Sequence, residues 1–324
     1  MKNITVLVPE GAVLTSIADP QYMFTAANKF LIDSGREPMF NVQLAGLKRE
    51  VVLNNGSFSI HTDHLLDEIP KTDLIIIPAL SGDMKNAVEV NKDFIPWITE
   101  QYKNGSEVAS LCIGAFLLAA TGLMKGKQCS THWLYANEFR HMYPDVILAG
   151  DKVVTDQNGL YSSGGATSLW NLLLYLVEKY TGRETAIIAS KFFLLDIART
   201  SQSPFIMFRG QKDHDDDAIK KAQEYIEQNY NDMLTVDRLS DLFGIGRRTF
   251  ERRFKKATNN TVVEYTQRVK IEAAKKELEQ GRKTISEVMF DVGYTDTKAF
   301  RDVFKKITGM SPVDYRNKYN NEAV

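Results

Sequence analysis

One sequence pattern occurs twice in the carboxyl-terminal third of the chain. The first copy spans residues 235–265 and the second spans residues 284–315. Corresponding positions are 49 residues apart up to Gly244 and Gly293 and 50 apart beyond them, so one residue has been added at the place where a turn tolerates it. The repeat therefore predicts two structurally equivalent units, and any fold for this region must accommodate both.

Each copy is typical of a helix-turn-helix. A threonine that can cap a helix opens each copy, and Thr284 with Glu287 forms a capping-box pattern. Gly244 and Gly293 allow the left-handed backbone that ends a first helix and turns the chain into a second. Apolar residues recur at helical spacing in each first helix. They are Val236, Leu239, Leu242 and Phe243 in one copy and Ile285, Val288, Met289 and Val292 in the other.

The second helix of each copy has an apolar face and a charged face. Phe250 and Phe254, and equally Phe300 and Phe304, lie four residues apart and define the buried side. Arginine can donate two hydrogen bonds to guanine, carboxylates can accept a hydrogen bond from cytosine, and lysines can pair with phosphates. The opposite face is therefore a candidate for DNA recognition. The predicted DNA-binding residues are Arg248, Glu251, Arg252, Lys255, Lys298, Arg301, Asp302 and Lys305.

A single charged helical face is more often merely solvated, but the duplication favours DNA binding. A long amphipathic segment at about 262–279 joins the copies, so two recognition helices could enter major-groove segments about 34 Å apart. Residues 218–319 resemble the DNA-binding domain of the AraC/XylS regulators, most specifically in the second copy, from Ile285 to Tyr294 and from Gly309 to Arg316. The resemblance implies an all-α domain with two helix-turn-helix motifs that binds double-stranded operator DNA.

Charge divides the chain in the same place. From residue 218 onward there are 21 Lys+Arg and 16 Asp+Glu, which leaves 19 and 25 before it. A basic domain after an acidic one is the electrostatic pattern expected when nucleic acid is bound at one end. We therefore predict a first domain at 1–208, a polar linker at 209–217 and a DNA-binding domain at 218–320. His214 stands among aspartates in that linker, but consecutive residues of a flexible segment cannot preorganise a metal site, and none is predicted.

Strand-like and helix-like segments alternate through the first 200 residues, which predicts a parallel sheet covered by helices. The run at 74–77 is apolar without alternation, as a strand buried on both faces should be. The sequence thus predicts an α/β doubly wound, flavodoxin-like amino-terminal domain. No run approaches the roughly 20 apolar residues of a membrane span. With only two distant cysteines, the composition favours a soluble chain in the reducing cytoplasm.

Cys112 is the most informative residue of this domain. A predicted strand ends just before it and a helix begins just after Gly114, which is the pattern of a nucleophile elbow. Such a turn would expose the thiol at the sheet edge, where a helix amino terminus favours thiolate. His132 follows twenty residues later and could hydrogen-bond the cysteine. Alternatively, each is an ordinary packing residue.

The motifs around Cys112, Gly122, His132 and the segment at 161–165 resemble the PfpI/ThiJ type of class I glutamine-amidotransferase-like domain over residues 2–205. Enzymes of that superfamily commonly carry an acid four residues before a proline in the loop after the first strand, and here that position is Ser16. The resemblance therefore implies a pocket rather than a complete catalytic set. We predict no catalytic residue and no cofactor, and the candidate ligand-pocket residues are Ser16, Cys112, Ile113 and His132.

Together the two domains resemble the GlxA-type regulators of the AraC/XylS family. That resemblance implies a non-enzymatic homodimeric transcription factor whose amino-terminal domain senses an unidentified small-molecule effector, and which contacts RNA polymerase if it is an activator. Two alternatives remain open at this stage. One is a cysteine-dependent hydrolase or isomerase fused to a DNA-binding module, and the other is a redox sensor that acts through Cys112.

Overall fold

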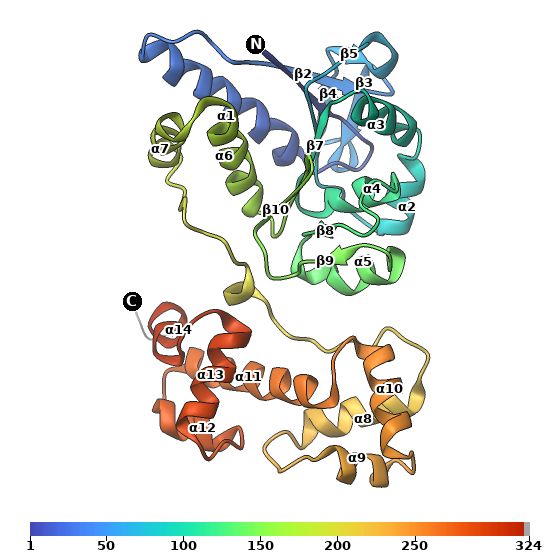
Figure 1. Cartoon of the computed structure of the whole chain (residues 1–324), viewed down its shortest axis with the longest axis vertical. Coiled ribbons are helices and arrows are strands. Elements are labelled where there is room, and N and C mark those ends of the chain that lie inside the picture. The colour runs from blue at the N-terminus through green and yellow to red at the C-terminus, as the bar shows by residue number, and fades with distance from the viewer. Residues whose placement is uncertain (321–324) are drawn as a thin grey trace. The chain divides into compact units, whose positions relative to one another are not determined.

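A computed structural model, described here for residues 1–320, divides the chain into two compact units between Gln202 and Ser203 (Figure 1). The first unit is a doubly wound α/β domain and the second is entirely helical, which confirms the predicted fold class. Among the described residues, none of the helices is long and apolar enough to cross a membrane.

A seven-stranded sheet forms the centre of the first unit, in the order β10-β11-β7-β6-β1-β2-β5. Every neighbouring pair is parallel except β10 and β11. The central strand β6 is buried at all four residues, which confirms the prediction for 74–77. The strands are β1 (Lys2–Leu7), β2 (Phe40–Gly46), β5 (His64–Leu65), β6 (Leu74–Ile77), β7 (Glu107–Ser110), β10 (Val154–Gln157) and β11 (Leu160–Ser163).

Helices cover both faces of this sheet, each over its own apolar core (Figure 1). On one face lie α1 (Leu14–Asp33), α6 (Ser168–Thr181) and α7 (Arg183–Phe192). On the other lie α2 (Met84–Val90), α3 (Phe94–Lys103), α4 (Ala115–Ala120) and α5 (Ala136–Met142). The strands β1, β6 and β7 are parallel neighbours, so their carboxyl ends meet at one edge of the sheet, and Cys112 lies in the segment that leaves β7 there.

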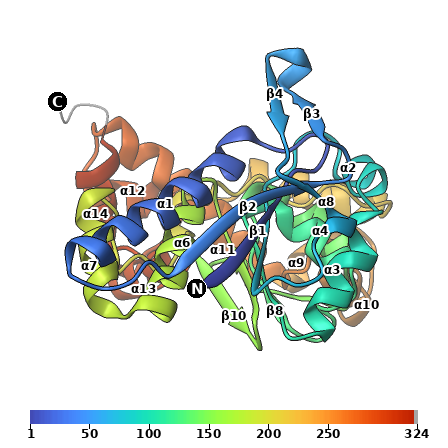
Figure 2. The same ribbon diagram turned by 90° about the horizontal axis from the view of Figure 1, so that it is seen from above.

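Short elements complete the unit. The hairpin of β3 (Glu50–Leu53) and β4 (Phe58–His61) projects from the sheet (Figure 2), and β8 (Gln128–Cys129) pairs with β9 (Ile147–Leu148). Single turns of 3-10 helix, labelled η, lie between them. They are η1 (Asn54–Gly56), η2 (Leu66–Glu68), η3 (Cys112–Gly114) and η4 (Trp133–Tyr135).

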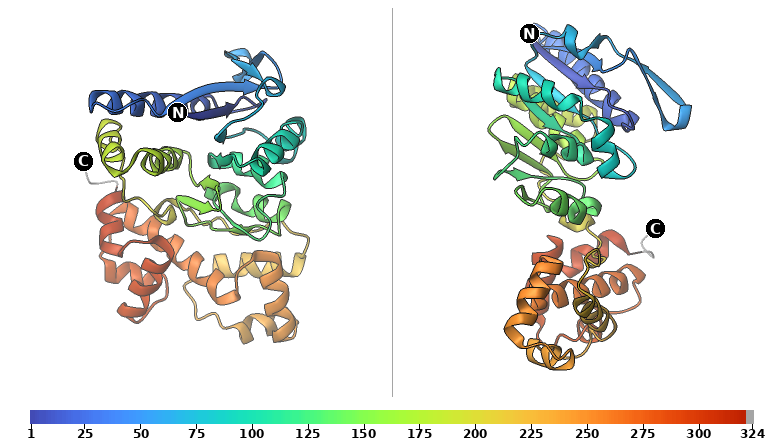
Figure 3. Two further views of the ribbon diagram at one scale, coloured as in Figure 1. Left: turned by 45° about the horizontal axis from the view of Figure 1, so that its top comes forward. Right: turned by 90° about the vertical axis from the view of Figure 1, so that its right-hand side faces the viewer.

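The helical unit consists of two three-helix groups joined by the long helix α11 (Val262–Gln280) (Figures 1 and 3). The amino-terminal half of α11 packs with α8 (Asp217–Gln228), α9 (Val236–Leu242) and α10 (Arg247–Thr258) in one apolar core. Its carboxyl-terminal half packs with α12 (Ile285–Asp291), α13 (Thr297–Thr308) and α14 (Pro312–Tyr319) in another. The predicted amphipathic segment at 262–279 is thus one helix that serves both cores.

The segment predicted as a free linker, 209–217, is instead folded onto the helical unit. The Gln223 side chain donates to the backbone oxygen of Gln211 at 2.9 Å, and Lys212 pairs with Glu227 at 2.7 Å. Upstream of it, η5 (Ser203–Phe205) also belongs to this unit. The boundary therefore lies near 202 rather than 208, because Ile206 and Phe208 also have hydrogen-bond partners on α11, which local sequence composition does not reveal.

Candidate nucleic-acid interface and ligand site

Both helix-turn-helix motifs form as the repeat predicts. The Thr235 hydroxyl accepts the backbone N–H of Arg238 at the start of α9, and the capping box of Thr284 and Glu287 starts α12. Gly244 and Gly293 adopt the left-handed backbone, with φ of 62° and 76°. The expected buried stripe is wrong at Leu242, which is 52% exposed because it lies in the last turn of the short helix α9.

The second helix of each motif presents the predicted charged face. Phe250 and Phe254 in α10, and Phe300 and Phe304 in α13, are fully buried. All eight predicted DNA-binding residues are exposed. Over residues 1–320, the side chains of six of them form no intramolecular hydrogen bond or ion pair, so these groups are available to an external partner. The six are Arg248, Arg252, Lys298, Arg301, Asp302 and Lys305.

The other two members of this face have internal partners. Lys255 donates to the backbone oxygen of Asn259 at 2.9 Å and lies 3.6 Å from Glu264, while Glu251 lies 3.8 Å from Arg247. Arg247 itself donates twice to the Asp237 carboxylate, at 2.9 Å to each oxygen. These exposed contacts contribute little energy and can be exchanged for contacts to a phosphate or a base.

Arg253 has a structural partner although it neighbours Arg252 in sequence. Its guanidinium donates two hydrogen bonds to the Asp216 carboxylate, at 2.8 and 2.6 Å. The pair holds the pKa of Asp216 below its ordinary value, chiefly through the hydrogen bond from Arg253. Asp216 also caps α8 by accepting the backbone N–H of Ile219 at 3.2 Å. Sequence reasoning did not find this clamp, since its two residues are 37 positions apart.

Each of the two groups of helices contains an equivalent tyrosine–glutamate hydrogen bond. The Tyr265 hydroxyl donates to Glu227 at 2.6 Å, and the Tyr315 hydroxyl donates to Glu279 at 2.7 Å. Burial and the neighbouring carboxylate raise the pKa of each tyrosine. Helix α8 therefore supports the first motif as the end of α11 supports the second, so the repeat extends beyond the helix-turn-helix itself.

In the α/β unit, the backbone turns sharply at Cys112 where β7 ends. Its φ of 53° places a non-glycine residue in the left-handed region. Gly114 makes this turn possible, because a Cβ there would lie 2.4 Å from the backbone oxygen of Pro78. The Cys112 N–H donates to the Ser163 hydroxyl at 3.0 Å, and the Thr131 hydroxyl donates to the Cys112 carbonyl at 3.2 Å.

The expected thiolate is not supported. Cys112 is only 5% exposed, and burial raises the pKa of its thiol to about 12. The elbow geometry is present, but desolvation outweighs the short helix that follows. His132 accepts the Leu134 N–H on Nδ1 at 3.1 Å, and burial lowers its pKa. Among the described residues, none of the hydrogen bonds joins His132 to Cys112, so the predicted pairing is not formed.

Ser16, where the related enzymes hold an acid, is completely buried and fully engaged. Its hydroxyl donates to the Val13 carbonyl at 2.6 Å and accepts the Ala79 N–H at 3.0 Å. The hydroxyl therefore ties the start of α1 to the segment after β6. The nearby acid Glu10 points elsewhere and pairs with Lys48 at 2.5 Å. These contacts leave Ser16 as a positioning group rather than a proton donor.

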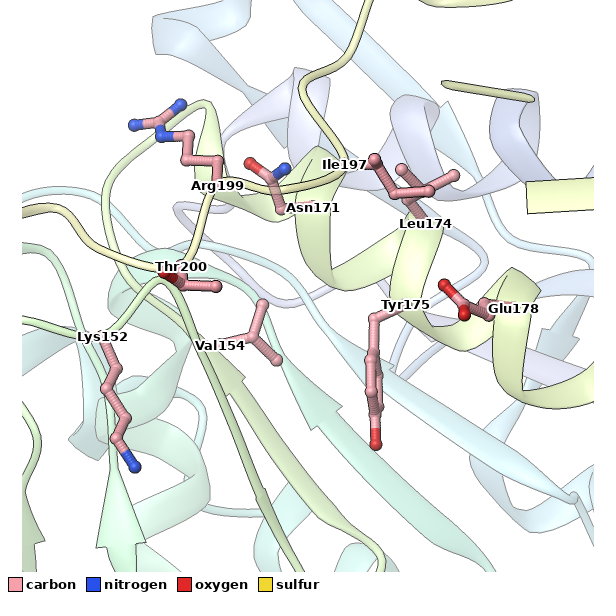
Figure 4. Close-up of a pocket in the computed structure, with 9 residues that line it drawn as sticks. All are labelled: Lys152, Val154, Asn171, Leu174, Tyr175, Glu178, Ile197, Arg199 and Thr200. Atoms are coloured by element: carbon pink, nitrogen blue, oxygen red, sulfur yellow. The ribbon is translucent and has the colours of Figure 1, made fainter. Parts of the chain in front are cut away.

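A hollow of about 350 Å³ lies on the α6 side of the same unit (Figure 4). Side chains of α6, the start of β10 and the segment at 197–200 line it. Tyr175 there donates to Asp156 at 2.6 Å. The lining residues are Lys152, Val154, Asn171, Leu174, Tyr175, Glu178, Ile197, Arg199 and Thr200.

Comparisons with known proteins agree with both halves of this description. Residues 7–179 match the DJ-1/PfpI family, and residues 239–318 match a helix-turn-helix domain. The chain is 24% identical over 316 residues to the HTH-type transcriptional regulator GbdR of Pseudomonas aeruginosa, across 97% of this chain and 84% of that one. It is 20% identical to the HTH-type transcriptional regulator GlxA of Rhizobium meliloti, across 66% of each.

A solved structure of an AraC family transcriptional regulator from Pseudomonas putida shares the α/β fold, with a TM-score of 0.51 and 17% identity. It covers 60% of this chain and 100% of that one. The duplicated helix-turn-helix fused to a DJ-1/PfpI-type α/β unit defines a DNA-binding transcription regulator of the AraC type. Through that α/β unit, the chain belongs to the DJ-1/PfpI family.

Proposed function

We propose that this regulator reads its operator with α10 and α13, and that a small effector bound in the crevice of Cys112 and His132 changes that binding. The observation that carries the first part is the pair of equivalent recognition helices, each with exposed charged residues that have no partner within residues 1–320. Arg248 and Arg252 supply base recognition in the first motif. Lys298, Arg301 and Asp302 supply it in the second, while Lys305 contacts phosphate.

We further propose that the chain is not an enzyme and acts in the cytoplasm as a homodimer. The buried thiol and the engaged hydroxyl of Ser16 support the first of these, since a cysteine nucleophile needs an accessible thiolate and a base in contact with it. The same features disfavour a redox sensor at Cys112. A dimer would allow effector binding in the α/β units to change how the paired DNA-binding units meet an operator, and with it any contact to RNA polymerase.

The test is selection of genomic DNA fragments by the purified full chain at one salt concentration, repeated with Arg248→Ala and Lys298→Ala. We expect a two-part motif of which each substitution weakens one part, with a loss of about 1–3 kcal/mol at the cognate site. Lys305→Ala should instead weaken cognate and random DNA alike. Lys221→Ala is the matched control, because Lys221 is exposed on α8, away from both recognition faces.

The result would contradict the proposal if the full chain enriched no motif above random DNA, or if all substitutions reduced binding to every fragment equally. A catalytic role would instead require a turnover that Cys112→Ala abolishes while operator binding stays intact.

A further inference from the structure

Two polar atoms near His132 are buried without a partner among the described residues. Gln202 is 1% exposed and Ser168 is completely buried. Within residues 1–320, neither Oε1 of Gln202 nor Oγ of Ser168 has a hydrogen-bond partner. A buried polar atom in this state carries a desolvation cost of about 1–3 kcal/mol. Two such atoms in one place indicate that something else supplies their hydrogen bonds.

The orientation of the Gln202 amide is fixed by its surroundings. Its Nε2 donates to the carbonyl of Thr131 at 3.1 Å and to the carbonyl of Lys152 at 3.2 Å. A flipped amide would place oxygen against both carbonyls, so Oε1 must be the acceptor that remains. Gly164 makes room for this amide, because a Cβ there would lie 2.6 Å from Nε2 and 2.9 Å from Oε1.

Both atoms border the volume beside Gly165 that a Cβ would occupy, each within 4 Å of it. A Cβ on Gly165 would lie 3.8 Å from Gln202 Oε1, 3.9 Å from Ser168 Oγ and 3.9 Å from Cδ2 of His132. This volume adjoins the Cys112 turn, because Thr131 contacts the Cys112 carbonyl and leads directly into His132. Side chains from three separate segments thus converge beside a glycine.

The groups that lie within 4 Å of the Gly165 Cβ position are uncharged or weakly basic, which favours a neutral occupant, and the Arg199 guanidinium near them donates to the Thr167 hydroxyl at 3.2 Å. Burial lowers the pKa of His132, which favours its neutral form, and burial raises the pKa of the Cys112 thiol, which favours its protonated form. The contacts of Gln202, Ser168 and Gly165 described above include no carboxylate that would balance a buried cation. An acceptor oxygen beside a hydroxyl therefore suits a neutral N–H or O–H donor.

We propose that Gln202 Oε1 and Ser168 Oγ bind the carboxamide or hydroxyl group of a small neutral effector. This assignment deepens the proposed function and rests on it. Gln202 and its segment lie beyond residues 7–179, over which the chain matches the DJ-1/PfpI family. Ser168, Gly165 and His132 lie inside that match, so Gln202 is the one member of the site that comes from beyond it.

The position of Gln202 in the sequence connects the proposed site directly to the DNA-binding unit. Gln202 is the last residue of the first unit, and Ser203 begins the second. Its backbone N–H donates to Asp151 at 2.8 Å, and Val153 donates to Thr200 at 3.1 Å, so a short ladder holds 200–202 in place. An effector bonded to Oε1 adds to the forces that hold the chain at the junction. A bound effector thus favours one conformation of residues 200–202, the segment that leads into the DNA-binding unit.

The test uses acetamide and N,N-dimethylacetamide as probes with the purified full chain, followed by ligand-observed saturation-transfer NMR. Acetamide offers two N–H donors, whereas the dimethyl compound has the same carbonyl and none. We expect acetamide to bind in the millimolar range and the dimethyl compound to bind about tenfold more weakly or not at all. Equal binding of both, or no binding of acetamide up to solubility-limited concentrations, would overturn the proposal and leave a bound water as the partner.

Two variants locate the binding. Ser168→Ala removes only an unpartnered hydroxyl, so the folded state loses no hydrogen bond and thermal unfolding should be unchanged. Gln202→Leu removes the acceptor but also two donated bonds, so a melting curve must accompany it. We expect about tenfold weaker acetamide binding in Ser168→Ala and unchanged binding in Ser190→Ala, a control on α7. Binding unaffected in folded Ser168→Ala and Gln202→Leu would refute the site. Failure of the DNA selection, by contrast, would refute the regulator and not this pocket.

Discussion

At the scale of single residues, burial decides what Cys112 can do. Its pKa of about 12, against an ordinary value of 9.0, leaves far less thiolate at pH 8 than a free cysteine has. We expect iodoacetamide to alkylate Cys112 in the native chain about a thousandfold more slowly than in the urea-unfolded chain. Peptide mapping by mass spectrometry measures the rate at Cys112 separately from that at Cys129.

The pH dependence provides a second check on the same thiol. The native rate should keep rising up to about pH 12 instead of levelling near pH 9. The unfolded state also releases its thiol protons first, so the free energy of unfolding should fall as pH rises between these values. Rapid alkylation at pH 8, at a rate that levels near pH 9, would contradict the buried thiol and revive the redox hypothesis.

Arg252 and Arg253 are neighbours with opposite expected roles. Arg252 is exposed without an internal partner in the described chain, whereas Arg253 forms the two-bond clamp with Asp216. We expect Arg252→Ala to weaken operator binding by about 1–3 kcal/mol and leave urea unfolding unchanged. Arg253→Ala should instead leave the affinity for operator DNA unchanged and slightly lower the urea midpoint of the helical unit, because it removes the partly exposed two-bond clamp with Asp216. The assignment would be reversed if Arg252→Ala lowered stability and Arg253→Ala weakened operator binding in a stably folded chain.

Residue-level prediction succeeded where helical periodicity decides exposure. Residue spacing alone correctly predicted that the phenylalanines of α10 and α13 are buried and that all eight charged residues are exposed. It failed at Cys112, because desolvation depends on segments far away in sequence. Gln202 could not be found either, since its two amide partners are 50 and 71 positions distant and a lone glutamine carries no local pattern.

At the scale of elements, the equivalent turns offer a matched comparison. Gly244 and Gly293 share a left-handed φ, but a Cβ at Gly244 would meet nothing within 4 Å, whereas one at Gly293 would lie 2.3 Å from the Asn231 carbonyl. Gly244→Ala should therefore cost only the backbone strain, about 1 kcal/mol. We expect Gly293→Ala to cost at least twice as much in urea unfolding. Equal costs would mean that the second turn can shift away from Asn231.

Elements with strong local signals were predicted, and those without were missed. The helices α4 and α11 and the strand β6 lie where their apolar patterns place them. The strands β8 and β9 have two residues each, which is too short for periodicity to register. The helix α7 ends at Phe192, and Leu194 just beyond it has a left-handed φ of 53°, a limit that no local sequence pattern marks. Tertiary packing, not propensity, sets these limits.

At the scale of the whole molecule, the segment 203–216 belongs energetically to the DNA-binding unit. The ammonium of Lys275, whose side chain is 4% exposed, donates to the Ile206 carbonyl at 2.6 Å and pairs with Glu272 at 2.8 Å. Glu272 in turn accepts the Phe208 N–H at 3.0 Å. Without this segment, a nearly buried ammonium would lose a charged hydrogen bond that is worth about 1.5–3 kcal/mol.

Two fragments test this assignment, one of residues 203–320 and one of residues 218–320. We expect the longer fragment to be more stable in urea by about 3 kcal/mol, since it keeps the Lys275 contact and the Asp216 cap of α8, itself worth about 1 kcal/mol. Lys275→Met removes the ammonium, so the Lys275 contact should no longer contribute to the difference in urea stability between the two fragments. Equal stability of the two fragments would instead restore 209–217 as a free linker.

The same fragments test how the effector acts. If effector binding in the α/β unit controls DNA binding through the chain at Gln202 and Ser203, neither fragment can respond, because both lack the ligand site. The longer fragment should bind operator DNA with the same affinity whether or not a ligand of the α/β unit is present. The full chain should change its affinity when the same ligand is added. Response by a fragment equal to that of the full chain would place the effector site in the helical unit, where the coupling through Gln202 would have no role.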